Sequence, residues 1–164
     1  KRIITPEVFT YLLSTNRLVY HKDTSLDQDK IKVKLEMCKS TNLEFYDAHT
    51  PNTMFSLQAG ARGMSCIAGN FYPEMFSWMC DHVNDPQHHE QVKWVQSELT
   101  RADAIISQGY PLSAKYFLNK RGVPMELISR SAKSPLSKEQ QQALDQVHSN
   151  LMGWHERLGI KVTY

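Results

Sequence analysis

Lys22 is a candidate catalytic residue because of its type and its position at the end of a predicted strand. It follows a short apolar run, Leu18-Val19-Tyr20-His21, and precedes Asp23-Thr24-Ser25. Because side chains alternate along a strand, Leu18, Tyr20 and Lys22 are expected on one face. A lysine removed from water loses its proton more readily, and the free amine can attack a ketone to form a Schiff base. The alternative is a strand-end lysine whose ammonium group reaches out into water.

The sequence around and after Lys22 alternates between segments typical of strands and segments typical of helices. Strands are predicted at residues 18–21, 43–47 and 64–68. Helices are predicted at residues 5–14, at residues 50–60 and from residue 73 onward, and each opens with a proline at its first helical position. The spacing of Ile31, Leu35 and Cys38 predicts a further, amphipathic helix at residues 27–38. Only helical patterns follow, starting at Asp85-Pro86, at Pro111 and at the capping box of Ser137 and Gln140, whose helix stops at Gly159.

This order of elements predicts parallel strands joined by right-handed crossovers. Three such strands leave both sheet edges open, and a closed barrel takes roughly 250 residues. The expected fold class is therefore α/β: the C-terminal part of a (β/α)8 TIM barrel, with about three strand–helix units, and a C-terminal helical extension. Residues 1–84 are expected to form the partial barrel and residues 85–164 the helical region. The start at Lys1-Arg2 also suggests a fragment.

Composition narrows the classes of partner. The 164 residues carry 19 basic and 17 acidic side chains, a net charge of +2, which gives no reason to expect a nucleic acid or a membrane surface. No apolar stretch approaches the roughly 20 residues of a membrane span, and no signal peptide is recognised at the start of the sequence. With an odd count of three cysteines, a reduced, cytoplasmic protein is expected. The cysteines have no metal-like spacing, and we expect free thiols and no metal site. One basic cluster is expected to be a solvated helix face: Lys30, Lys32, Lys34 and Lys39.

Several segments are shared with a known family. They are Ile4-Thr5-Pro6-Glu7, His21-Lys22-Asp23-Thr24-Ser25, the glycine-rich residues 60–70, Tyr72-Pro73-Glu74 and residues 110–115. With them, nearly the whole chain resembles the C-terminal portion of the N-acetylneuraminate lyase / dihydrodipicolinate synthase family of class I (Schiff-base) aldolases. The resemblance implies that Lys22 forms an imine with the C2 ketone of pyruvate or another 2-oxo acid. The resulting electron sink would ease making or breaking the C3–C4 bond.

The resemblance also implies substrate contacts. Thr24 would contact the substrate, or would instead cap a loop. The loop Ala48-His49-Thr50 would line the pocket, and His49 would bind the distal end of the substrate or lie exposed. Ala48 replaces the family's usual glycine and the loop lacks acids, which disfavours a sialic-acid-like substrate. Ser65 and Cys66 would form the wall facing the imine, although alternation lets only one of them point inward.

Part of the family's machinery falls before residue 1. The general acid/base tyrosine and the hydroxyl pair that binds the 2-oxo carboxylate both lie upstream, and neither Tyr11 nor Tyr20 is expected to replace that tyrosine. The chain alone is therefore expected to be inactive unless an N-terminal segment completes the barrel. The resemblance further implies no cofactor and a homotetramer. Within the family, Lys22-Asp23-Thr24-Ser25 in place of a Glu-containing string favours a 2-keto-3-deoxy sugar acid as substrate over lysine biosynthesis. The second hypothesis is a truncated, inactive member that binds a partner across its open sheet edge.

Overall fold

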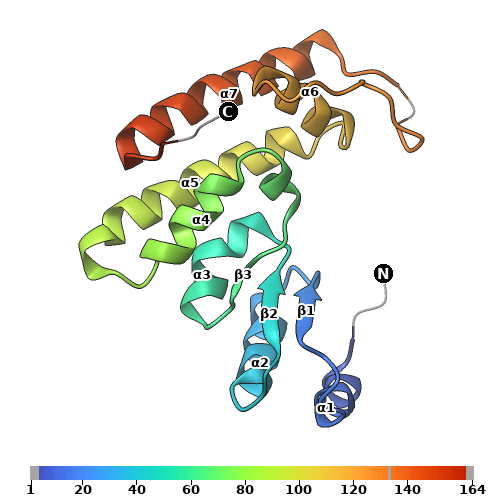
Figure 1. Cartoon of the computed structure of the whole chain (residues 1–164), viewed down its shortest axis with the longest axis vertical. Helices are drawn as coiled ribbons and strands as arrows, with labels where there is room; N and C mark the ends of the chain where they lie inside the picture. Colours follow the sequence, from blue (N-terminus) through green and yellow to red (C-terminus); the bar gives the residue numbers. More distant parts are fainter. Residues whose placement is uncertain (1–3, 133, 162–164) are drawn as a thin grey trace.

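The computed structural model describes residues 4–132 and 134–161. Its elements run in the order α1 (Pro6–Ser14), β1 (Tyr20–Asp23), α2 (Gln28–Cys38), β2 (Glu44–Asp47), η1 (Thr50–Asn52), α3 (Thr53–Gln58), β3 (Gly63–Met64), η2 (Ile67–Asn70), α4 (Pro73–His82), η3 (Pro86–His88), α5 (His89–Ile106), α6 (Leu112–Lys120) and α7 (Lys138–Leu158). Figure 1 shows the small sheet at one end and the long helices α5 and α7 at the other. This is the partial barrel with a helical extension that the sequence predicts.

Local signals place the helix ends as expected. The side chain of Thr5 accepts a hydrogen bond from the Val8 amide, and that of Asp27 accepts from two amides at the start of α2. The capping box of Ser137 and Gln140 opens α7, and Gly159 ends it in the left-handed conformation at φ 66°. Each cap satisfies backbone groups that a helix end leaves without partners, so these boundaries follow from neighbouring residues alone.

The sheet is parallel, in the order β1-β2-β3, with Lys22 opposite Tyr46 and Asp23 opposite Asp47. Its strands differ from the predicted ones. The first begins at Tyr20 rather than residue 18 and includes Lys22, because its ladder starts where β2 starts, with Glu44 N donating to Val19 O at 2.8 Å. The third is only Gly63–Met64 rather than 64–68. Since β2 ends at Asp47, the chain after Ser65 has no neighbouring strand to bond and turns into η2.

One face of the sheet is covered by helices. Phe45 of β2 is buried against a small cluster that includes Phe9 of α1 together with Ile31 and Leu35 of α2. The opposite face carries Tyr20, which is 65% exposed, and Lys22. The sheet therefore has a packed side and an open side.

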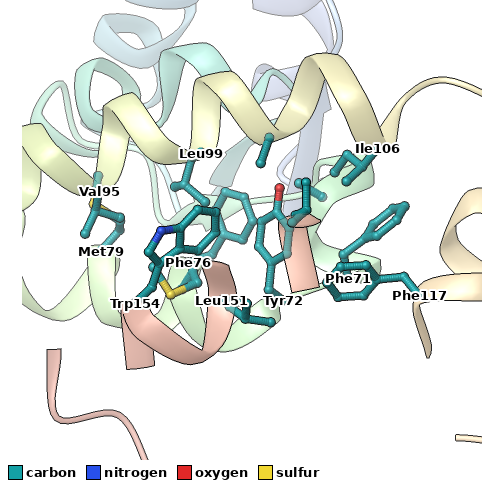
Figure 2. Close-up of a cluster of buried hydrophobic side chains, with 14 of the residues drawn as sticks. Phe71, Tyr72, Phe76, Met79, Val95, Leu99, Ile106, Phe117, Leu151 and Trp154 are labelled. Carbon is teal, nitrogen blue, oxygen red and sulfur yellow. The ribbon is translucent and has the colours of Figure 1, made fainter. Parts of the chain in front are cut away.

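A second, larger hydrophobic cluster joins helices α4 to α7. Tyr72 lies at its centre (Figure 2). Its ring is stacked on that of Phe76, with 6.1 Å between the ring centroids, and it meets the rings of Phe117 and Trp154 edge to face. A buried polar cluster ties α4 to the end of α6 and to α7: Glu74 Oε1 lies 2.8 Å from His155 Nε2 and 3.0 Å from Arg121 Nη2. The large hydrophobic cluster contains residues from both sides of the expected boundary between residues 84 and 85. The division of the chain into two domains at this boundary therefore stays a prediction.

Candidate functional site

Lys22 lies near the carboxyl end of β1, on the open face of the sheet. Alternation places Tyr20 and Lys22 on this face and turns His21 and Asp23 toward the helices. The His21 ring packs between Phe9 and Phe45, at 4.8 and 5.4 Å. The amine of Lys22 is therefore presented away from the hydrophobic cluster, at the end of the sheet where parallel barrels carry their chemistry.

The surroundings of Lys22 in this chain are open. The side chain is exposed, and within residues 4–132 and 134–161 it forms no hydrogen bond or ion pair. The removal from water that would favour its neutral form is thus not provided by the described residues. Any such shielding has to come from atoms that cover the open face.

Asp23, the next residue, is buried and fully engaged. Its Oδ1 accepts hydrogen bonds from the amide and the hydroxyl of Ser25, and its Oδ2 lies 2.5 Å from Lys34 Nζ. Burial by itself would raise the pKa of Asp23, but hydrogen bonds from His21, Lys34 and Ser25 outweigh burial and hold the pKa well below its usual value. The carboxylate is therefore anionic in the folded chain.

Lys34 corrects one expectation from the sequence. It was expected on a solvated helix face, yet it is 4% exposed and its ammonium points at Asp23. A signal was present, because Ile31, Lys34, Leu35 and Cys38 share the helical spacing of the buried face of α2. Lys30 and Lys39 of the same cluster are exposed and pair with acids on α2 or at its cap.

Thr24 follows the end of β1 and lies beside Lys22. Both residues line a small pocket of about 110 Å³, whose wall also includes Ile4, Ser25 and Lys34. Such a volume holds a few water molecules, since one water occupies about 30 Å³ of the liquid. Thr24 is half-buried, and its role as a substrate contact stays a prediction.

The loop after β2 divides into two parts. The Ala48 amide donates to Asp23 O at 2.9 Å, which brings the loop against the strand end that carries Lys22. The His49 amide donates to Asp47 Oδ1, while its ring atom Nδ1 is buried without a hydrogen-bond partner in the described part of the chain. Thr50 is 2% exposed and its carbonyl accepts from Gln96 of α5. Ala48 and His49 are therefore near Lys22, whereas Thr50 is covered by α5.

Ser65 and Cys66 lie on opposite sides of the chain, as alternation requires. Cys66 packs against the large hydrophobic cluster. Burial raises the pKa of its thiol, and neighbouring groups, including hydrogen bonds from Gly69 and Thr50, offset part of this effect. Ser65 N extends the ladder to Asp47 O at 2.7 Å, and strand alternation places its side chain on the face of Lys22. Of this pair, Ser65 shares the face of Lys22 and Cys66 is turned toward the large cluster, and the role of either in a substrate site stays a prediction.

The open face also carries a polar group that the sequence reasoning left out. Tyr46, directly opposite Lys22, donates its hydroxyl to Glu44 Oε2 at 2.9 Å, and Arg62 Nε lies 3.5 Å from Glu44 Oε1. The hydrogen bond to Glu44 raises the pKa of Tyr46, so its phenol stays protonated. Gly63 makes room for this ring, because a Cβ there would lie 3.1 Å from it.

Two further classes of site receive no support from the described residues. Nowhere in residues 4–132 and 134–161 do three or more His, Cys, Asp or Glu side chains come together in a way that could hold a metal ion. In the same ranges, the helices are too short or too polar to cross a membrane.

Comparisons with known proteins agree with this geometry. The sequence pattern of the Dihydrodipicolinate synthetase family matches residues 2–151. The 4-hydroxy-tetrahydrodipicolinate synthase of Methylacidiphilum fumariolicum SolV is similar in structure, with a TM-score of 0.79 and 17% identity over 95% of this chain and 52% of that chain. Dihydrodipicolinate synthase from Thermotoga maritima gives 0.74 and 19% identity, over 95% of this chain and 51% of that one.

A prophage protein of the dihydrodipicolinic acid synthase family from E. coli K12, solved in complex with pyruvate, gives a TM-score of 0.75 and 15% identity over 96% of this chain and 52% of that one. A search of curated proteins found no match. At these identities the structures show the fold alone, and the chain spans about half the length of each. The match over residues 2–151 covers most of the 164 residues, and the chain therefore belongs to the dihydrodipicolinate synthetase family.

Proposed function

We propose that this chain is the lysine-bearing part of a class I aldolase or lyase that acts on pyruvate or a 2-keto-3-deoxy sugar acid. The observation that carries the proposal is the position of Lys22, near the carboxyl end of β1 and on the open face of the sheet, in a chain that belongs to this family. Two solved structures similar to this chain contain pyruvate, which supports a 2-oxo acid as the ligand.

The proposed chemistry begins with the neutral amine of Lys22. It adds to the C2 ketone, and loss of water gives an iminium ion. Loss of a C3 proton to a base then gives an enamine, which attacks an aldehyde carbon and forms the C3–C4 bond; the reverse sequence cleaves that bond. Hydrolysis of the final iminium returns the amine and the 2-oxo acid product.

The neighbouring residues have distinct proposed roles. Thr24, Ala48 and His49 contact the substrate, because they lie at the same end of the sheet as Lys22. Ser65, which directly follows β3, faces the imine. Thr50 and Cys66 pack behind this wall and hold its shape, since both are turned toward α5 and the large cluster.

The activity requires a cover over the open face. Lys22 is exposed, and the described residues provide neither a 2-oxo carboxylate pocket nor the family's proton-transfer tyrosine. We therefore propose that a barrel-completing segment packs on this face, in a cytoplasmic homotetramer of the kind the family suggests. That segment would remove Lys22 from water and supply the missing groups.

Trapping the imine tests the proposal. The chain is incubated with pyruvate and sodium borohydride, and its intact mass and peptides are measured, with Lys22→Arg as the negative variant and Lys32, an exposed lysine of α2, as the internal reference. An adduct on Lys22, absent from Lys32 and lost in the variant, is the expected result. An intact chain that forms no adduct, with or without an added barrel-completing segment, would contradict the proposal.

A second candidate function rests on a different observation. β1 is an edge strand in the described sheet, and Tyr20 beside Lys22 is 65% exposed, so the open edge and face could serve as a binding surface. A truncated, inactive family member would use them to hold a partner strand. Partner binding that survives Lys22→Arg, together with no pyruvate adduct, would favour this function.

A further inference from the structure

Two buried aspartates end neighbouring strands in the same way. Asp23 closes β1 and Asp47 closes β2, and the two are register partners, 1% and 0% exposed. In each, Oδ1 accepts the amide two residues on, from Ser25 at 2.7 Å and from His49 at 2.9 Å. In each, Oδ2 contacts the helix that follows the strand. Both carboxylates thus fix the turn that leaves the sheet at its functional end.

The two aspartates differ in the partner of Oδ2. Asp47 accepts a hydrogen bond from the hydroxyl of Ser56, at 2.6 Å. Asp23 contacts Lys34, whose side chain is 5% exposed and whose ammonium lies 2.5 Å away. Ser56 shows that a neutral donor on the following helix can satisfy such an aspartate. The full positive charge at Lys34 therefore calls for a reason beyond hydrogen bonding.

The neighbour of Asp23 in the sequence, Lys22, provides that reason. An anion next to Lys22 would favour the ammonium form of Lys22, which cannot attack a ketone. Lys34 neutralises this anion from the packed side of the sheet, where water screens the interaction little. Lys22 and Lys34 line the same small pocket at the end of β1, which places the ion pair in the immediate surroundings of Lys22.

We propose that the Asp23–Lys34 ion pair is a positioning device for Lys22: it anchors the end of β1 to α2 and keeps the electrostatic field at the nucleophile near neutral. The inference rests on the proposed function of Lys22 and adds Asp23 and Lys34 to the site as positioning residues. They act through the strand end and through its field, not by touching the substrate.

Other charged groups face Lys22 and have to stay constant in a test. On the packed side His21 Nε2 lies 3.5 Å from Asp23 Oδ2, and on α2 Lys30 pairs with Asp27. The groups on the open face and at the neighbouring strand end are Tyr20, Glu44, Tyr46, Arg62, Asp47 and His49. Substitutions at positions 23 and 34 leave these residues unchanged, and among them only His21 loses a charged partner, in Asp23→Asn.

The test measures the pH at which Lys22 becomes reactive. Acetic anhydride labels neutral amines, so peptide mass spectrometry of the whole chain labelled at a series of pH values gives a midpoint for Lys22 without any need for turnover. Lys34→Met leaves Asp23 without its cation and is expected to move this midpoint up by a few tenths of a pH unit, because Lys22 is exposed to water. Asp23→Asn leaves Lys34 without its anion and is expected to move the midpoint down by about as much.

Three further variants separate this role from a merely structural one. The double variant Asp23→Asn/Lys34→Met removes both charges and is expected to restore the wild-type midpoint, and Lys34→Arg keeps it. Lys30→Met, which removes an exposed lysine one turn earlier on α2, is the matched control and leaves it unchanged. Circular dichroism selects the variants that fold. If Lys34→Met does not fold, Lys34→Gln takes its place, and if Asp23→Asn does not fold, Asp23→Ser takes its place. Each replacement removes the same single charge, so the same direction of shift is expected.

The outcomes separate the inference from the function. Opposite shifts in the two single variants, with recovery in the double variant, support the inference. Unshifted midpoints, or shifts in the same direction, overturn it even if wild-type Lys22 traps pyruvate. A wild type that shows these opposite shifts but never traps pyruvate overturns the proposed function and leaves the field effect on Lys22 established.

Discussion

The helical region and the sheet region differ in how they bury their side chains. Helices α4 to α7 enclose a large aromatic cluster in which Phe71, Tyr72 and Phe117 are wholly buried, and the cluster of Glu74, Arg121 and His155 links three of these helices. The sheet packs one face on α1 and α2 and leaves Tyr20 and Lys22 exposed on the other. The helical region thus buries its large side chains among its own helices, whereas the face proposed to be functional stays open in the described residues.

The largest effect is expected in the helical region. Phe117→Ala removes a ring that meets Phe71 at 5.3 Å and Tyr72 at 6.2 Å in a wholly buried place. The free energy of unfolding is expected to fall by about 3–5 kcal/mol, measured by urea denaturation. Phe117→Leu, which keeps most of the buried volume, is the control and should lose much less. A loss below 1 kcal/mol would mean that this cluster is loosely packed.

The next largest effect is a loss of folding stability at low pH that is due to Asp23 in the sheet region. The pKa of Asp23 is well below its usual value in the folded chain, so the folded state binds this proton more weakly than the unfolded state. The resulting stability is present above about pH 3.9 and is lost as the pH falls further. Asp23→Asn should reduce the free energy of unfolding by about 2 kcal/mol at pH 7 and flatten its decline below pH 4. Urea denaturation from pH 7 to pH 3 checks this, and equal slopes in the two proteins would contradict it.

A smaller loss of folding stability is expected from the helical region, and it should begin at a higher pH. Burial lowers the pKa of His148, and the cations of Arg121 and Lys120 lower it further. Protonation is therefore easier in the unfolded chain, and stability should begin to decline as the pH falls below about 6.5. His148→Gln should remove this early decline and keep the later one due to Asp23. Thermal melts at closely spaced pH values separate the two, and an unchanged profile in the variant would assign the early decline to another group.

The smallest effect is expected on the open face. Tyr20→Ala removes a side chain that is 65% exposed and lies 6.0 Å from the Tyr46 ring, so the free energy of unfolding should change by less than about 0.5 kcal/mol. The measurement is the same urea titration as for Phe117→Ala. A loss comparable to that of Phe117→Ala would show that the face is covered in solution, by a second copy or by an added segment.

Much of the fold could be predicted because its signals are local. A cap bonds amides two or three residues away, so Thr5, Asp27 and Ser137 mark the helix starts without reference to anything distant. The alternation of strands and helices likewise predicts the parallel sheet, and the segment around Lys22 carries the family resemblance. For the site, alternation predicted that Leu18, Tyr20 and Lys22 share one face. Tyr20 and Lys22 do share it, whereas Leu18 precedes β1 and packs against the cluster of α1 and α2. That the face of Lys22 lies away from the helices is known only from the structure.

Only the tertiary structure decided the ends of the strands and the surroundings of the site. β3 stops at Met64 because β2 stops at Asp47, a dependence between segments that no local pattern encodes. Lys34 is buried because Asp23 lies across from it, and Thr50 is covered because Gln96 of α5 reaches its carbonyl. The sequence by itself determined which residues could react and which helices would form. Which charges are buried and which face stays open depend on contacts between residues far apart in the chain, and those exist only once the chain is packed.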